Sequence, residues 1–295
     1  MAEKPINVSK KVRKKVKLII NADDLGLCRS VNEAIMSTFM AGNLTSATMM
    51  VNMPGSNNAM ELIKGGVGPV IGLHFNLTEG RPVSKANSFV GSEGYFLPRK
   101  ELIKRIILKQ IDLAEIQEEL LAQMEVLERN GIPFYHVDSH QHILMIPQIF
   151  NAVQPILEQK GKGIRVVRPT AQQKELRFKR PMKYLRSMFN IWSAERIKKK
   201  YTCRTNDFLV SIHDLQDPRD FNRDTYRSLI MTAPEQSVLE LMVHPYILND
   251  DVTDLYATSI QSKMPFLQKC EREHDILSGE PLFSDFDLIS FKDLR

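Results

Sequence analysis

The chain has 295 residues, 43% of them hydrophobic and 25% charged, which is typical of a folded globular protein and excludes a disordered or collagen-like chain. No apolar run approaches the roughly 20 residues of a membrane-spanning helix, and no apolar signal segment follows the basic start, so we expect neither a membrane span nor a secretory leader. Three scattered cysteines (Cys28, Cys203 and Cys270) favour reduced thiols and a cytoplasmic location over a disulfide framework.

The net charge of +5 is unevenly distributed along the chain. Residues 1–17 contain seven Lys or Arg and one acid, and residues 160–206 contain fifteen Lys or Arg and two acids, so the remainder is acidic. Basic segments are usually solvated surface, but they can also bind an anionic partner such as nucleic acid, a membrane surface or an anionic glycan. We expect residues 1–15 to form a flexible basic tail and residues 16–295 to form a single domain.

In the first half of the chain, strand-like and helix-like segments alternate. A strand, a helix, a strand, a helix and a strand are predicted in that order at residues 16–22, 30–41, 44–51, 56–64 and 70–77. Ser30 is expected to cap the first helix, with Glu33 completing a capping box. Residues 78–100 are rich in Gly, Pro and Ser and predict a long loop.

The second half continues this alternation. The predicted order is a helix at 112–131, a strand at 134–140, a helix after Pro147, strands at 163–168 and 207–213, a helix at 220–231 and a strand at 238–244. Residues 170–205 interrupt the pattern as a basic helical insertion that contains the only tryptophan, Trp192. Alternating strands and helices predict a parallel α/β sheet, and this number of strands favours a distorted (β/α) barrel over an open doubly wound sheet.

Polar side chains follow four of the predicted strands. They are Asp23 and Asp24, then His74, then Asp138, His140 and His142, and finally His244. Because the carboxyl ends of parallel strands meet at one edge of a sheet, we expect these groups to converge. Side chains two residues apart on an extended strand point to one side, so His140 and His142 are expected to face one ligand. His136 and His213 fit the pattern less well and are interpreted as structural or supporting residues.

One carboxylate and two or three imidazoles aimed at one point are typical of a mononuclear catalytic metal site. These groups suit zinc and similar divalent ions, with one position left for water. A cation would also stabilise the adjacent carboxylates of Asp23 and Asp24, which otherwise repel each other. The carboxylate that does not bind the ion is then placed to act as a general base.

Four segments together resemble the YdjC/ChbG-type carbohydrate deacetylases: NADDLG (21–26), GLHFNLT (72–78), VDSHQHILMIPQIF (137–150) and MVHPY (242–246). The resemblance extends over about residues 16–246. It implies a distorted (β/α) barrel, one divalent metal ion (Mg or Zn) and hydrolysis of an N-acetyl group on an amino sugar. Chitooligosaccharides are the best-known substrates of that family.

The resemblance also implies roles for individual residues, by their positions in the four motifs. Asp24, His74 and His140 would be the metal ligands. Asp23 would be the general base, and His244 would be the general acid that protonates the leaving amine.

Two further residues are implied to support the site. His142 would line it as an alternative ligand or hydrogen-bond partner, and Asp138 would orient a histidine. In the predicted long loop, Phe89, Tyr95 and Phe96 are expected either to stack on sugar rings or to anchor the loop to the core.

Two other functions stay open from the sequence. One is a metal-dependent hydrolase of another amide or of a phosphoester. The other is a non-enzymatic nucleic-acid-binding module that uses the basic residues 1–17 and 160–206, with an affinity that falls steeply with salt. The expected partners are an N-acetylated sugar and an anionic partner for the basic insertion, with a homodimer as a further option.

Overall fold

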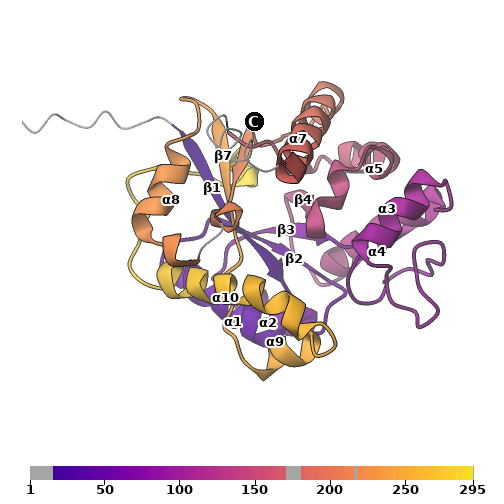
Figure 1. Ribbon diagram of the computed structural model, residues 1–295, viewed down its shortest axis with the longest axis horizontal. Helices are drawn as coiled ribbons and strands as arrows, with labels where there is room; N and C mark the ends of the chain where they lie inside the picture. Colours follow the sequence, from indigo (N-terminus) through magenta and orange to yellow (C-terminus); the bar gives the residue numbers. More distant parts are fainter. Residues whose placement is uncertain (1–15, 171–180, 216–217, 295) are drawn as a thin grey trace, which may run out of the picture.

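The computed structural model describes residues 16–170, 181–215 and 218–294 (Figure 1). The predicted basic tail, residues 1–15, and residues 171–180 of the predicted insertion lie outside the described residues. Within the described residues, no helix is long and apolar enough to cross a lipid bilayer. All three cysteines have free thiols.

The centre of the fold is one sheet in which every paired strand is parallel. Its strands are β1 (Lys17–Leu25), β2 (Ser46–Met49), β3 (Val70–Phe75), β4 (His136–Ser139), β5 (Gly163–Ile164), β6 (Phe208–Val210), β7 (Val238–Val243) and β8 (Asp287–Leu288). The order across the sheet is β5-β4-β3-β2-β1-β7-β6, and β8 pairs with β1. Strand β1 is buried from Leu18 to Leu25 and opens with the apolar residues Leu18, Ile19 and Ile20, as is typical of a central strand in a parallel sheet that is covered on both faces.

The sheet curls into a half-barrel. Its two edges approach each other where the Ile164 N–H donates to the Arg204 carbonyl (2.9 Å) and the Leu209 N–H donates to the Arg168 carbonyl (2.8 Å). These isolated bonds replace a regular strand pair, so the barrel is distorted on this side. The predicted fold class, a parallel α/β structure of the distorted barrel type, is confirmed.

Helices surround the outside of the sheet, with α7 rising beside α5 (Figure 1). The α-helices are α1 (Arg29–Met40), α2 (Ser56–Lys64), α3 (Arg99–Ile107), α4 (Leu113–Arg129), α5 (Pro147–Gln159), α7 (Pro181–Lys200), α8 (Arg223–Ile230), α9 (Asp250–Leu255) and α10 (Ile260–Leu277). Short 3₁₀ segments are η1 (His140–Met145), η2 (Ile212–Asp214), η3 (Pro218–Asp220) and η4 (Phe291–Asp293). Helix α7 shows that the predicted basic insertion is helical over Pro181–Lys200.

The helix ends differ in how well the sequence predicted them. At the start of α4, the Asp112 side chain accepts a hydrogen bond from the Ala114 N–H (2.9 Å), as an N-cap should. The predicted capping box of α1 is wrong, because the helix begins one residue earlier, after Cys28, and no side chain caps it. Ser30 is instead buried within the helix.

Several predicted strands are shorter in the structure; the strand predicted at 207–213, for example, covers only Phe208–Val210. The strand predicted at 134–140 ends at Ser139, because His140 starts η1, where Gln141 and His142 have left-handed φ angles of 52° and 57°. The strand predicted at 163–168 is regular only over Gly163–Ile164, because the residues that follow lie along the open side of the barrel.

The loop after β3 is anchored to the core by its own aromatic side chains. Phe89 and Phe96 are buried and stack on each other with ring centroids 5.8 Å apart. Tyr95 is exposed and lies against Arg81. None of the three lines the pocket described below, so the anchoring interpretation is the correct one for Phe89 and Phe96.

Candidate metal and active site

The end of β1 separates two adjacent carboxylates. Asp24 has a φ of 66°, an uncommon conformation for a residue other than glycine, and the register with β2 shifts between Ala22 and Leu25. Gly26 follows with a φ of 93°, and a Cβ atom there would lie 2.4 Å from the Met50 carbonyl oxygen. This bulge lets Asp23 and Asp24 contact different partners.

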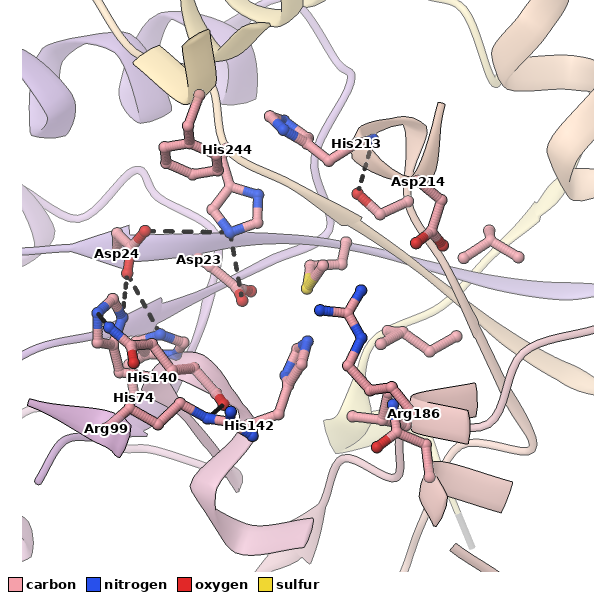
Figure 2. A pocket seen from close by; sticks show the side chains of 18 of the residues that line it. Asp23, Asp24, His74, Arg99, His140, His142, Arg186, His213, Asp214 and His244 are labelled. Carbon is pink, nitrogen blue, oxygen red and sulfur yellow. Dashed lines mark hydrogen bonds and ion pairs between the residues drawn. The ribbon is translucent and has the colours of Figure 1, made fainter. Parts of the chain in front are cut away.

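Asp24 meets two histidines, His74 on β3 and His140 at the start of η1. Its Oδ1 atom lies 3.3 Å from His74 Nε2 and 3.0 Å from His140 Nδ1. The three ligand atoms lie within 4.8 Å of one another (Figure 2). One carboxylate oxygen and two imidazole nitrogens at this spacing fit a single divalent cation that keeps open positions.

The electrostatics of this cluster also favour a cation. Burial lowers the pKa of His74, but Asp138 and Asp24 outweigh it and raise that pKa to about 10. Burial likewise lowers the pKa of His140, while Asp24 and Glu79 raise it to about 9. Positive charge is therefore stabilised at this point, and a metal ion would take the place of the two protons.

Each side chain of the cluster is fixed by a further contact. His74 Nδ1 hydrogen-bonds Asp138 Oδ1 (2.7 Å), which leaves Nε2 to face Asp24. The Tyr246 hydroxyl donates to Asp24 Oδ2 (2.6 Å), and His140 Nε2 lies 3.0 Å from Glu79 Oε2. Contacts of this kind orient metal-binding groups in known sites.

Arg165, which the sequence analysis did not single out, holds the second aspartate. Its guanidinium donates to both oxygens of Asp23 (2.7 Å each), and it also contacts Asp138 (2.7 Å) and Glu240 (2.6 Å). All four side chains are at least 97% buried. An arginine between the apolar residues Ile164 and Val166 of a predicted strand was the available signal.

This arrangement sets the charge of two acids. Burial raises the pKa of Asp23, but Arg165 outweighs it and holds that pKa well below its usual range. Burial has the larger effect on Glu240, whose pKa rises to about 7 although Arg165 lowers it. Arg165 therefore keeps Asp23 ionised in the interior of the barrel.

His244 follows β7 on the other side of Asp23. Its Nε2 atom lies 3.8 Å from Asp23 Oδ2 and 4.0 Å from Asp24 Oδ2 (Figure 2). Its backbone N–H donates to Glu273 Oε2 (2.6 Å), and the same oxygen lies 2.9 Å from His213 Nε2. Burial lowers the pKa of His244.

A cavity of about 480 Å³ is lined by Asp23, Asp24, His74, His140, His244 and Tyr246. His142 and His213 line it as well, whereas His136 stacks on Phe291 in the interior, with ring centroids 4.0 Å apart. The expectation that His140 and His142 both lie on a strand is wrong, since η1 begins at His140, although both side chains line the same cavity. His142 is outside the group of Asp24, His74 and His140 that could hold a metal ion.

The chain is similar to known proteins over most of its length. Residues 17–286 match the YdjC-like protein family. A chitooligosaccharide deacetylase of Serratia marcescens is 30% identical over 285 residues, which cover 94% of this chain and 98% of that protein. A chitooligosaccharide deacetylase of Yersinia enterocolitica is 38% identical over 157 residues, which cover 53% of this chain and 61% of that protein.

A solved structure from Enterococcus faecalis V583 shares the fold. It has a TM-score of 0.72 at 22% identity and covers 94% of this chain and 98% of its own, and it is described provisionally as a cellobiose-phosphate cleavage protein. The chain therefore belongs to the YdjC-like protein family, and its similarity to carbohydrate deacetylases supports an enzyme.

Proposed function

We propose that this chain is a metal-dependent hydrolase that removes the acetyl group from the nitrogen of an amino sugar, as in chitooligosaccharide deacetylation. The observation that carries the proposal is the convergence of Asp24, His74 and His140 at one point of the pocket wall. Two of the relatives described above are named for the same reaction. The match to the Yersinia relative covers less than two thirds of that protein, whereas the Serratia relative matches over its full length.

In this proposal, Asp24, His74 and His140 hold one divalent cation, Mg²⁺ or Zn²⁺. The cation supplies Lewis acidity toward the acetamide carbonyl and toward water. Asp138 keeps the His74 ring in place through its 2.7 Å bond to Nδ1. The Tyr246 hydroxyl donates a hydrogen bond to Asp24 Oδ2, so that Asp24 Oδ1 faces both histidines.

Asp23 is the proposed base. Arg165 keeps it ionised and fixes the direction of both carboxylate oxygens. Oδ1 also accepts a hydrogen bond from the Asn21 side-chain amide (3.0 Å), so Oδ2, on the side of His244, keeps the lone pair that can accept a proton. Asp23 accepts a proton from the attacking water as the new C–O bond forms at the acetyl carbon. The contact with Arg165 therefore orients the carboxylate of Asp23 and also stabilises its ionised form.

His244 is the proposed acid. Its Nε2 atom lies on the cavity side near Asp23, and Glu273 holds its backbone. The proton that Asp23 takes from the water passes to His244, whose Nε2 atom lies 3.8 Å from Asp23 Oδ2, and then to the sugar nitrogen as the C–N bond breaks, which leaves acetate and a free amine. Among the pocket residues, Tyr256 and Phe266 offer aromatic surfaces for a sugar ring.

The proposal is tested by acetate release from N-acetylated chitooligosaccharides with the metal-loaded protein. We expect release that is lost in Asp24→Asn and reduced roughly 10²–10⁴-fold in Asp23→Asn, the usual size of a general-base contribution. Asp275→Asn, an exposed carboxylate on α10, is the control and should retain full activity. Circular dichroism verifies that each variant is folded.

Two outcomes would replace the proposal. Metal-dependent hydrolysis of phosphoesters without acetate release would favour the other hydrolase class. Tight, salt-sensitive binding of nucleic acid without any hydrolysis would favour the binding module. The homodimer, the choice of metal and the cytoplasmic location stay predictions from the sequence.

A further inference from the structure

Helix α7 has an exposed apolar face that the proposed reaction does not use. Its five large apolar residues with exposed side chains, with their exposed fractions, are Met182 (76%), Leu185 (60%), Met188 (44%), Phe189 (42%) and Trp192 (51%). At 3.6 residues per turn, the five fall within about a third of the helix circumference. Phe189 and Trp192 contact each other within this face, with ring centroids 5.8 Å apart. We call these five residues the α7 apolar face.

The other side of α7 packs on the body of the protein. Ile191, Ala194 and Ile197 are buried there, and the Ser193 hydroxyl donates to the Met145 carbonyl in η1 (2.5 Å). The helix thus has two apolar sides, and only one of them is covered by the described residues. A helix held this way presents its outer apolar side as a fixed surface.

Positive charge lies at the C-terminal end of the α7 apolar face. Lys199 and Lys200 are exposed in the last turn of the helix, and the Arg196 guanidinium lies 6.0 Å from the centre of the Trp192 ring. Residues 160–206 as a whole contain fifteen Lys or Arg against two acids. Exposed Trp, Phe and Leu beside Lys and Arg are typical of helices that lie in the interface of a membrane.

We propose that α7 docks this protein on the surface of an anionic lipid bilayer. The α7 apolar face would enter the boundary between headgroups and acyl chains, and the flanking Lys and Arg would contact the anionic headgroups. A second copy of the chain is a poorer partner, because pairing two such helices would bring their like charges together. Nucleic acid offers phosphates for the cations but leaves exposed aliphatic side chains such as Leu185 without an apolar partner.

Docking through α7 would place the pocket next to the membrane. Arg186 and Asn190, on the same helix, line the pocket, and Figure 2 shows Arg186 among the other pocket residues. Arg186 lies about one ninth of a turn from Met182 around the helix axis, at the edge of the α7 apolar face. The pocket would therefore lie beside the docked helix, close to the layer of lipid headgroups.

The single tryptophan makes a direct test available. Trp192 is the only tryptophan in the chain, so intrinsic tryptophan emission reports α7 alone. The full-length protein is titrated with vesicles of phosphatidylglycerol and phosphatidylcholine in equal amounts, and with vesicles of phosphatidylcholine alone. We expect co-sedimentation with the anionic vesicles, together with a blue shift of the emission, and much weaker binding to the neutral vesicles.

A matched pair of variants isolates the apolar face. Leu185→Ser/Phe189→Ser keeps Trp192 and every charge, including those of residues 1–15, and is expected to weaken vesicle binding at least about tenfold, or about 1.4 kcal/mol. Leu113→Ser/Leu121→Ser removes two apolar side chains of α4 that are 41% and 43% exposed, and it should bind like the unmodified protein.

Three results would overturn the proposal. The first is the absence of binding to anionic vesicles. The second is binding in which the emission of Trp192 does not change or in which the α7 double variant binds normally, because another segment then makes the contact. The third is a blue shift that occurs in the absence of lipid, either when the protein concentration rises or when RNA is added. A second copy of the chain or nucleic acid would then be the partner of the α7 apolar face.

Discussion

Replacing Arg165 by methionine should destabilise the fold strongly. The guanidinium is the positive group that contacts Asp23, Asp138 and Glu240 at 2.6–2.7 Å, and its side chain is 1% exposed. Methionine fills a similar volume but leaves three buried acids without this partner. Removing one partner of a buried ion pair costs about 3–5 kcal/mol, a large part of the roughly 5–15 kcal/mol that stabilises a typical domain.

The measurement is the free energy of unfolding in urea at pH 8, followed by circular dichroism. At pH 8, Glu240, whose pKa is about 7, is mostly ionised in the unmodified protein. We expect Arg165→Met to lose about 3–5 kcal/mol and the double variant Arg165→Met/Glu240→Gln to recover part of that loss, since one uncompensated charge is removed. A loss below about 1 kcal/mol would refute the interpretation that Arg165 neutralises the barrel interior.

Three further changes test other parts of the structure. Tyr246→Phe removes the bond to Asp24 Oδ2 and should weaken Zn²⁺ binding about 10–100-fold in competition with a chelator; unchanged affinity would mean that Tyr246 does not orient Asp24. Gly26→Ala should cost about 1–3 kcal/mol in urea unfolding, because φ is 93° and Cβ would meet the Met50 carbonyl; a neutral effect would show that the bulge adapts. Burial lowers the pKa of His136 from 6.5 to about 3, so the unfolded chain binds the proton first and stability falls as pH drops below 6.5. His136→Leu should reduce the loss of stability between pH 7 and pH 5 by about 2 kcal/mol, and an equal loss in both proteins would contradict this assignment.

The sequence predicted the sheet well because its strands are apolar runs separated by regular helices. It placed Asp24, His74 and His140 at the same edge, and the structure brings their ligand atoms within 4.8 Å. This succeeded because parallel strands carry their carboxyl ends to one side of the sheet, so strand position alone locates a residue. Predicting that His140 lies at this edge required only the approximate end of β4, not its exact last residue.

The local backbone at the site could not be predicted in the same way. The left-handed conformations of Asp24, Gln141 and His142 depend on tertiary contacts, and these residue types do not require them. The assumption of a straight strand through His142 therefore failed. The capping box at Ser30 failed for a related reason, since the residue that precedes α1 is Cys28 and Ser30 is buried.

Arg165 was missed because the sequence analysis assigned the stabilisation of Asp23 and Asp24 to a metal ion alone. In the structure the two carboxylates have different positive partners, because Arg165 contacts Asp23 while the two histidines face Asp24. Partners 142 residues apart in the chain cannot be paired from one sequence. The contact of His213 with Glu273 was hidden for the same reason.

The central claim is that Asp24, His74 and His140 bind one divalent cation, and metal analysis of the purified protein tests it most directly. After dialysis against Zn²⁺ and removal of the excess, the unmodified protein should retain about one ion per chain, whereas Asp24→Asn and His74→Ala should retain little or none although they remain folded. Retention of no ion by the unmodified protein, or of equal amounts by all three proteins, would contradict the assignment.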